Sequence, residues 1–139
     1  MLVSDYNKGF VTEELLRDLD YGNVFIDTKK TNLGFLKNAW VKVNEVESMR
    51  LTSNPKNLIV TLGRRGAMYE DQVVSPPYEN AGVDPCGAGD TFLAAFAYFK
   101  TEGYGVFRSV EFANEAAFVT CREVGTYAPT MEEIDEILS

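Results

Sequence analysis

Short apolar runs, each followed by polar or glycine residues, set the pattern of the first half of the chain. The clearest lie at residues 2–3, 23–27, 39–43 and 57–62. Apolar runs of this length predict β-strands that are buried in a sheet. Weaker strand patterns follow around Val73 and Val83. The first half is therefore predicted to supply the strands of the fold.

Helix and turn signals lie between these runs. Thr12, which is followed by acidic residues, is the predicted N-cap of a helix, and Gly22 is predicted to end that helix. A short helix is predicted to follow Asn44. The segment 63–66 contains two glycines and two arginines, which predicts a turn and a hairpin into residues 67–71.

The last third of the chain has a helical pattern. Residues 88–101 are apolar nearly all round, which predicts a buried helix. Residues 106–121 place their apolar side chains on one helical face. Thr130 and Glu133 form a capping-box pattern for a final helix. Strands that alternate with helices predict an α/β fold with a mainly parallel sheet.

Composition narrows the possible functions. The chain has 139 residues, which suits one domain, and its formal net charge is −8. General nucleic-acid binding is not expected without a basic face. No apolar run approaches the ~20 residues of a membrane span, and a signal-peptide pattern is absent, so we expect a cytoplasmic protein without membrane partners. The sequence has no histidine, which excludes histidine-based triads and metal sites.

Polar and glycine residues cluster where the predicted strands end. In a parallel sheet these ends share one edge, which is where ligands bind in such folds. The residues are Asp5, Lys8, Asp27, Lys29, Asn44, Glu47, Gly63, Gly66 and the segment from Asp84 to Asp90.

The segment from Asp84 to Asp90 reads DPCGAGD and precedes the apolar helix. Gly87, Ala88 and Gly89 leave the N–H groups at the predicted helix start open to an anion. Asp90, in the first turn, can accept a proton from an attacking hydroxyl. A glycine turn capped by acidic residues explains the same pattern, so these residues alone leave both interpretations open. Walker and dinucleotide-binding motifs are not matched.

This segment, continued by TFLAA, closely resembles the C-terminal signature of PfkB-type (ribokinase-like) carbohydrate kinases. Further stretches resemble the family in the same order. Residues 44–47 resemble its Asn-x-x-Glu motif, 60–66 its nucleotide-side strand and turn, and 112–117 with 125–126 its helix and loop near adenine. The resemblance implies a ribokinase-like three-layer α/β/α fold and ATP-dependent phosphorylation of a sugar hydroxyl.

The resemblance also implies roles for single residues. Asp90 would be the general base, and residues 87–89 would form the anion hole. Asn44 and Glu47 would position Mg²⁺ through water. The nucleotide-binding residues implied are Thr61, Gly63, Gly66, Asp84, Asn114 and Thr126. Asp84 is also the candidate for organising a monovalent cation.

Structural alternatives remain open for most of these residues. Asn44 with Glu47 is also a helix-capping pattern. Gly63 and Gly66 alone are better explained by a turn. The adjacent pair at residues 29–30 is typical of solvated lysines, and Asn114 takes its role from the resemblance alone.

Within the family, residues 4–9 (SDYNKG) and 27–29 (DTK) look most like the D-glycero-β-D-manno-heptose-7-phosphate kinase branch. In that case the acceptor is the anomeric hydroxyl of a sugar phosphate. Asp5 and Lys8 are then the candidate substrate residues.

The resemblance covers residues 1–139 as the C-terminal, nucleotide-binding part of such a kinase domain. The family's N-terminal half, with most of the sugar pocket and a lid, has no counterpart here. We therefore expect activity to need a missing N-terminal half, with a homo-oligomer as another candidate arrangement. The alternative function is a non-catalytic adenine-nucleotide-binding or interaction module derived from such a kinase.

Overall fold

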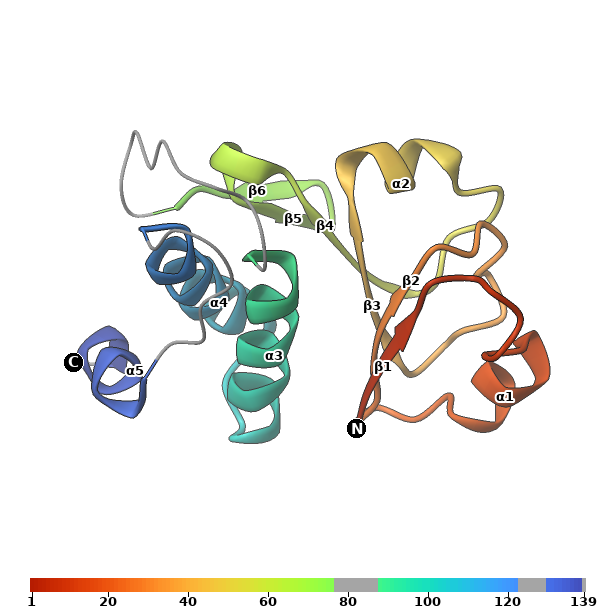
Figure 1. Cartoon of the computed structure of the whole chain (residues 1–139), viewed down its shortest axis with the longest axis horizontal. Helices are drawn as coiled ribbons and strands as arrows, with labels where there is room; N and C mark the ends of the chain where they lie inside the picture. Colours follow the sequence, from red (N-terminus) through yellow and green to blue (C-terminus); the bar gives the residue numbers. More distant parts are fainter. Residues whose placement is uncertain (77–87, 123–129, 139) are drawn as a thin grey trace. The chain divides into compact units, whose positions relative to one another are not determined.

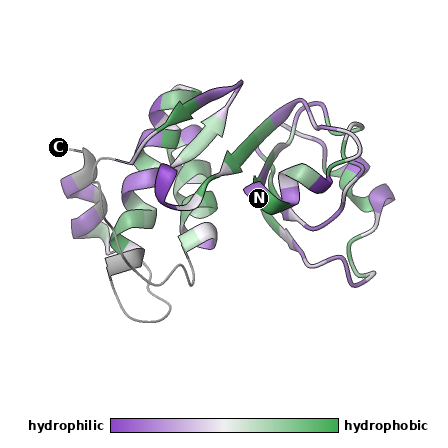
Figure 2. Cartoon of the chain, turned by 90° about the horizontal axis from the view of Figure 1, so that it is seen from above, coloured by the Kyte–Doolittle hydropathy of each residue, from purple (hydrophilic) through white to green (hydrophobic). Residues whose placement is uncertain are grey.

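The computed structural model describes residues 1–76, 88–122 and 130–138 (Figure 1). The chain divides into two compact units, Met1–Thr61 and Leu62–Ser139. Apolar residues, green in Figure 2, lie along strands and helices of both units. Among the described helices, none combines the length and hydropathy that a membrane crossing requires.

Four parallel strands form the sheet of the first unit, in the order of the sequence. They are β1 (Leu2–Asp5), β2 (Phe25–Thr28), β3 (Trp40–Asn44) and β4 (Asn57–Thr61). The register aligns Leu2 with Phe25, Phe25 with Trp40, and Trp40 with Asn57. The four strong strand predictions and their parallel arrangement are confirmed. Their carboxyl ends lie at one edge, as the sequence predicted.

Two short helices connect these strands, α1 (Glu13–Asp18) and α2 (Glu45–Arg50). The Thr12 hydroxyl accepts the N–H of Leu15 at 3.1 Å, so the predicted N-cap is confirmed. The predicted end at Gly22 is wrong, because α1 already ends at Asp18. Two residues later, the Asp20 carboxylate accepts the backbone N–H groups of residues 37–39.

The core of the first unit surrounds β2 and β3, which are buried along nearly their whole length. Central parallel strands covered on both faces require apolar runs, which these strands have. Burial of each large apolar side chain contributes roughly 1.5–3 kcal/mol. Fully buried members are Leu16, Ile26, Leu33, Leu36, Val41 and Val43.

The second unit begins with a short turn and a hairpin. Its elements are the 3₁₀ turn η1 (Gly63–Arg65), β5 (Ala67–Tyr69) and β6 (Gln72–Val74). β5 and β6 pair antiparallel through a two-residue turn at Glu70 and Asp71, where φ is 49° and 61°. Both values are typical of a tight hairpin turn. The turn at 63–66 and the strand at Val73 were predicted, whereas the turn at 70–71 was not.

Three helices complete the second unit: α3 (Ala88–Thr101), α4 (Val106–Arg122) and α5 (Met131–Leu138). α3 packs on α4, and α4 on α5 (Figure 1). The rings of Phe99 and Phe112 join the first pair, with centroids 4.6 Å apart. The predicted burial of α3 is confirmed for Phe92, Leu93, Phe96, Ala97 and Phe99, whereas Ala94 and Tyr98 are exposed on one face.

The last helix starts as the sequence predicts. Thr130 Oγ1 accepts the N–H of Glu133 at 3.2 Å, and Glu133 Oε2 accepts the N–H of Thr130 at 2.8 Å. This is the reciprocal pattern of a capping box. The weak strand predicted around Val83 lies outside the described residues.

Candidate functional site

A capping box holds Asn44 and Glu47 at the start of α2. Asn44 Oδ1 accepts the N–H of Glu47 at 2.8 Å, and Glu47 Oε2 accepts the N–H of Asn44 at 2.9 Å. These bonds satisfy two N–H groups that a helix start leaves unpaired. The structural alternative for this motif is therefore confirmed. It uses one of the two carboxylate oxygens of Glu47.

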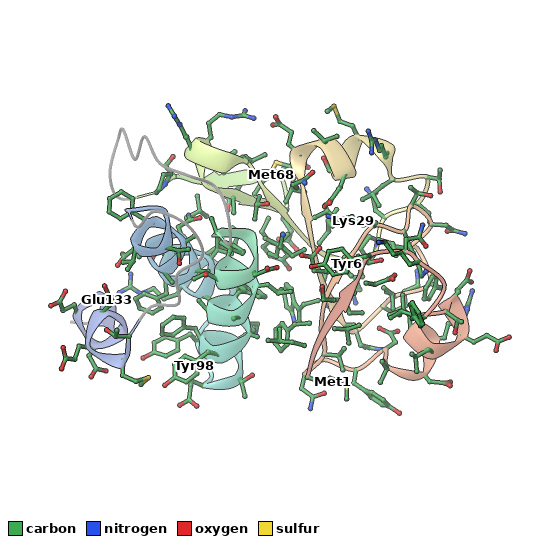
Figure 3. The ribbon with its side chains drawn as sticks, viewed as in Figure 1. Met1, Tyr6, Lys29, Met68, Tyr98 and Glu133 are labelled. Atoms are coloured by element: carbon green, nitrogen blue, oxygen red, sulfur yellow. The ribbon has the colours of Figure 1, made fainter. Side chains whose placement is uncertain are left out.

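Lys29, labelled in Figure 3, follows β2 and bonds the second oxygen of Glu47, Oε1. This hydrogen bond raises the pKa of Lys29. Burial raises the pKa of Glu47, but the hydrogen bonds from Lys29 and from the N–H of Asn44 outweigh it and hold that pKa below its usual value. Both partners are therefore charged at neutral pH.

Two lysine–aspartate ion pairs also lie toward the carboxyl ends of the parallel strands. Lys42 on β3 places Nζ 3.3 Å from Asp27 Oδ2 on β2, and the two residues are register neighbours. Lys30 Nζ lies 3.3 Å from Asp5 Oδ2, which also accepts the Thr28 hydroxyl at 2.8 Å. Asp5 is only 4% exposed. Its carboxylate is thus a buried connection between β1, β2 and the loop that follows β2.

A cavity of about 240 Å³ opens at the start of α2. Its lining carries three cationic side chains and one carboxylate, so it is net positive. Arg50 forms no ion pair with any residue that the structure describes. A positive, partly enclosed surface favours anions. The lining residues are Lys29, Lys30, Thr31, Asn44, Val46, Glu47 and Arg50.

Lys8 and Thr61 are the other residues of this unit that the sequence singled out. Thr61 ends β4 beside Asn44 in the register, and its hydroxyl donates to the carbonyl of Val43 at 3.3 Å. Lys8 is exposed in the loop after β1. The sheet thus brings Asn44 and Thr61 side by side, while Lys8 lies on the surface.

Gly66 and Asn114 of the second unit meet at one carbonyl, that of Val74. Gly66 has a φ of +98°, and a Cβ added there would lie 2.0 Å from the Val74 oxygen. Asn114 Nδ2 donates to the same oxygen at 2.9 Å. Gly63 also has a positive φ, +60°, but faces open space. Both Gly66 and Asn114 therefore fix the hairpin, and their predicted contact with a nucleotide stays a prediction.

The start of α3 carries Ala88, Gly89 and Asp90. The helix begins at Ala88, and Asp90 is exposed in its first turn. An acidic residue there is stabilised by the partial positive charge of the helix start. The hydroxyl of Thr91 lies 3.0 Å from that of Thr120, which fixes this turn against α4. Three predicted site residues lie outside the described residues: Asp84, Gly87 and Thr126.

This chain would hold Mg²⁺ through water. The described residues contain no group of three or more acidic, cysteine or histidine side chains placed to hold a metal ion. The capping box uses Asn44 Oδ1 and Glu47 Oε2, and Lys29 bonds Glu47 Oε1. Mg²⁺ keeps several waters and binds few protein groups when it accompanies phosphates. Glu47 Oε1 lies outside the capping box, so a metal-bound water there would compete with Lys29.

The model of the family described as pfkB family carbohydrate kinase matches residues 35–134 of this chain. The chain belongs to this family. The matched range includes the Asn-x-x-Glu motif at 44–47 and the Gly-Ala-Gly-Asp motif at 87–90. The resemblance drawn from these motifs is thereby confirmed for the PfkB chain.

Two curated relatives extend this comparison. The bifunctional protein HldE of a Nitratiruptor species is 32% identical over 161 residues, covering 98% of this chain and 35% of that protein. The ribokinase of Bacillus subtilis is 37% identical over 97 residues, covering 66% of this chain and 33% of that protein. The PfkB chain thus spans about a third of the length of these relatives.

Solved structures give the fold. Ribokinase from Thermotoga maritima matches with a TM-score of 0.71 and 21% identity, covering 99% of this chain and 56% of that one. Arabidopsis thaliana ribokinase, complexed with ribose and ATP, matches with a TM-score of 0.64 and 25% identity, covering 84% and 47%. The predicted ribokinase-like fold with a mainly parallel sheet is confirmed.

Sequence reasoning missed part of the cavity lining. It placed Lys29 at the shared strand edge but interpreted residues 29–30 as a solvated pair, and it did not single out Arg50. A signal was present, because Arg50 lies three residues after Glu47 and so falls on the same side of α2. Lys29 also follows the predicted strand end at Asp27 by two residues.

Proposed function

We propose that this PfkB chain is the nucleotide-binding part of an ATP-dependent kinase that phosphorylates a hydroxyl of a sugar or sugar phosphate. The observation that carries the proposal is the Gly-Ala-Gly-Asp motif at the start of α3 in a chain of this family. The 14-residue helix α3 starts there, and a helix start carries N–H groups without intrahelical partners and a partial positive charge. Small residues at that point let an anion approach them.

In this proposal the Gly-Ala-Gly-Asp motif supplies the groups that catalyse phosphoryl transfer. N–H groups of residues 87–89 stabilise the charge that develops on the transferred phosphoryl group. Asp90 accepts the proton of the attacking hydroxyl. Its exposure in the first turn of α3 supports this role, since a general base must reach the substrate. A monovalent cation near Asp84 belongs to the same proposal.

The proposal also assigns residues to nucleotide and metal binding. Thr61, Gly63 and Gly66 line the phosphate and ribose side, and Asn114 with Thr126 lies near the base. Bound Mg²⁺ would neutralise the charge of the phosphates. Asn44 and Glu47 would orient it through water, with Glu47 Oε1 as the oxygen outside the capping box.

The acceptor that we propose is a heptose 7-phosphate. Its support is the match to HldE across 98% of the chain and the stretches SDYNKG and DTK. Lys8, exposed after β1, would contact the acceptor. Asp5 is buried with its carboxylate engaged by Thr28 and Lys30, so it would act by holding those residues in place.

Most of the acceptor pocket would come from another polypeptide segment. The chain spans 35% of the HldE relative, so the rest of a kinase domain has room in proteins of that length. We propose that an N-terminal kinase segment, or a second copy of the chain, completes the site.

Sugar-dependent ADP release tests the function. The chain is mixed with the N-terminal part of the Nitratiruptor relative, and heptose 7-phosphate, ribose and fructose are compared as acceptors. We expect transfer to the sugar phosphate, and Asp90→Asn should lower its rate by about 10²- to 10⁴-fold. Asp135→Asn, at an exposed position of α5, should leave it unchanged.

The other outcomes separate the alternatives. Equal rates for wild type and Asp90→Asn would exclude Asp90 as the base. ATP binding with no transfer to any acceptor would favour the non-catalytic nucleotide-binding module. Faster use of free ribose or fructose would contradict the heptose assignment.

A further inference from the structure

Lys29 forms an ion pair with Glu47, the residue that the proposed function assigns to Mg²⁺. Its ammonium bonds Glu47 Oε1, while Glu47 Oε2 is held by the N–H of Asn44. The Glu47 side chain is 13% exposed, and that of Lys29 is 43% exposed. One oxygen of Glu47 thus faces a lysine that has room to move away.

We propose that Lys29 is a positioning residue that competes with the divalent cation for Glu47 and sets the affinity of the site for that cation. This inference rests on the proposed function, because it takes Glu47 as the residue that orients Mg²⁺. Lys29 keeps Glu47 paired when metal is absent. The carboxylate then has a defined position without a buried unpaired charge.

Competition follows from the geometry. The capping box restrains Glu47, so its side chain cannot turn Oε1 to a second partner without losing the bond to Asn44. A metal-bound water that donates to Oε1 competes with the ammonium for that oxygen. Two cations near one carboxylate also repel each other. Lys29 therefore weakens metal binding as long as it stays on Glu47.

The displaced ammonium has a place to go. Lys29 lines the 240 Å³ cavity together with Lys30 and Arg50. Lys30 is held by Asp5 at 3.3 Å, and Arg50 makes no ion pair with the described residues. A cavity of this size is below the roughly 300–1,000 Å³ of sites that enclose a whole ligand. It suits a single anionic group, such as a phosphate, which the freed Lys29 would then contact.

Direct binding of Mn²⁺, followed by calorimetry without nucleotide, tests the inference. Lys29→Met removes the ammonium and keeps much of the side-chain length. We expect Mn²⁺ to bind Lys29→Met about two- to fivefold more tightly than wild type, the effect of one partly exposed ion pair. Lys29→Arg should restore the wild-type affinity. A purely structural role of Lys29 would weaken binding, so the direction of the change is diagnostic.

Lys30→Met is the matched control. It removes the same charge from the same cavity but leaves Glu47 paired with Lys29. Its effect on Mn²⁺ should stay below about twofold, since repulsion through solvent is screened. An equal increase of Mn²⁺ affinity in both variants would mean that only the net charge of the cavity matters. Unchanged, weakened or undetectable Mn²⁺ binding in Lys29→Met would overturn the proposal.

The two proposals fail separately. Calorimetry with ADP in the presence of EDTA reports nucleotide binding without metal. Nucleotide binding with no tightening of Mn²⁺ in Lys29→Met would reject the role of Lys29 and leave the proposed function standing. Tighter Mn²⁺ binding in a chain that binds no nucleotide would support Lys29 and reject the function. Circular dichroism of each variant confirms that it is folded.

Discussion

At the scale of single residues, Asp20 shows how one carboxylate fixes a loop. It accepts the N–H groups of Lys37 and Ala39 at 3.0 and 2.8 Å, and that of Asn38 at 2.8 Å. Burial raises the pKa of this carboxyl, but the hydrogen bonds from the three N–H groups outweigh it and hold its pKa below the usual 3.8. The charged form is therefore the one that the folded state prefers.

Asp20→Ala should lower the free energy of unfolding by about 1–3 kcal/mol at neutral pH, because it leaves N–H groups of the 37–39 segment without their acceptor. The folded-state pKa of Asp20 is depressed, so its stabilisation is full above the unfolded value of 3.8 and is lost as the pH falls through the folded value. The difference between wild type and variant should therefore shrink on acidification. Urea denaturation at several pH values measures it.

Asp18→Ala is the control for this prediction. The side chain of Asp18 is exposed and makes no hydrogen bond or ion pair with the described part of the chain. Its replacement should change stability by less than about 0.5 kcal/mol. An Asp20→Ala variant as stable as Asp18→Ala at neutral pH would show that the loop does not depend on this carboxylate.

Single residues also show where sequence reasoning stops. The capping role of Asn44 and Glu47 was predictable, because both partners lie within one helical turn. The bond between Lys29 and Glu47 was not, since 18 residues separate the two and the sheet brings them together. The burial of Asp5 was likewise not predictable from its place at a strand end, since it depends on the packing of β1 beside β2.

At the scale of elements, the β5–β6 hairpin depends on close approach of Gly66. The backbone there has φ +98°, and the space for a side chain is filled by the Val74 carbonyl at 2.0 Å. Gly103 has nearly the same φ, +97°, with nothing within 4 Å. The two glycines thus share a positive φ, and only Gly66 meets a neighbouring atom.

Gly103→Ala should lower stability by about 1–2 kcal/mol, the cost of a left-handed conformation in a residue with a side chain. Gly66→Ala should cost about 1–3 kcal/mol more, because the hairpin must also shift to admit the methyl group. Thermal unfolding followed by circular dichroism compares the two. Equal losses would mean that β6 moves away from Gly66 without cost.

Elements with strong apolar patterns were the ones that the sequence predicted well. β2, β3, β4 and the later helices follow runs or helical faces that local physics decides. The turn at Glu70–Asp71 escaped prediction because it lacks the glycine that marks most such turns. The exposed face of α3 escaped because alanine and tyrosine are compatible with either environment.

At the scale of the whole molecule, the chain contains two compact units and matches one family along residues 35–134. The family and the fold could be predicted from short motifs, since each motif combines a backbone requirement with a chemical one. The residues that complete the acceptor site could not be predicted from this sequence, because the proposal places them on another polypeptide segment. The central claim therefore concerns the nucleotide-binding part: it binds ATP.

Calorimetry of ATP with Mg²⁺, on the purified chain and on Asp90→Asn, tests that claim most directly. Asp90 is assigned to the acceptor hydroxyl, so both proteins should bind with dissociation constants in roughly the 1 μM–1 mM range of enzyme substrates. Saturable binding by both would establish a working nucleotide site. No binding by a chain that circular dichroism shows to be folded would contradict the account, leaving the motif as architecture alone.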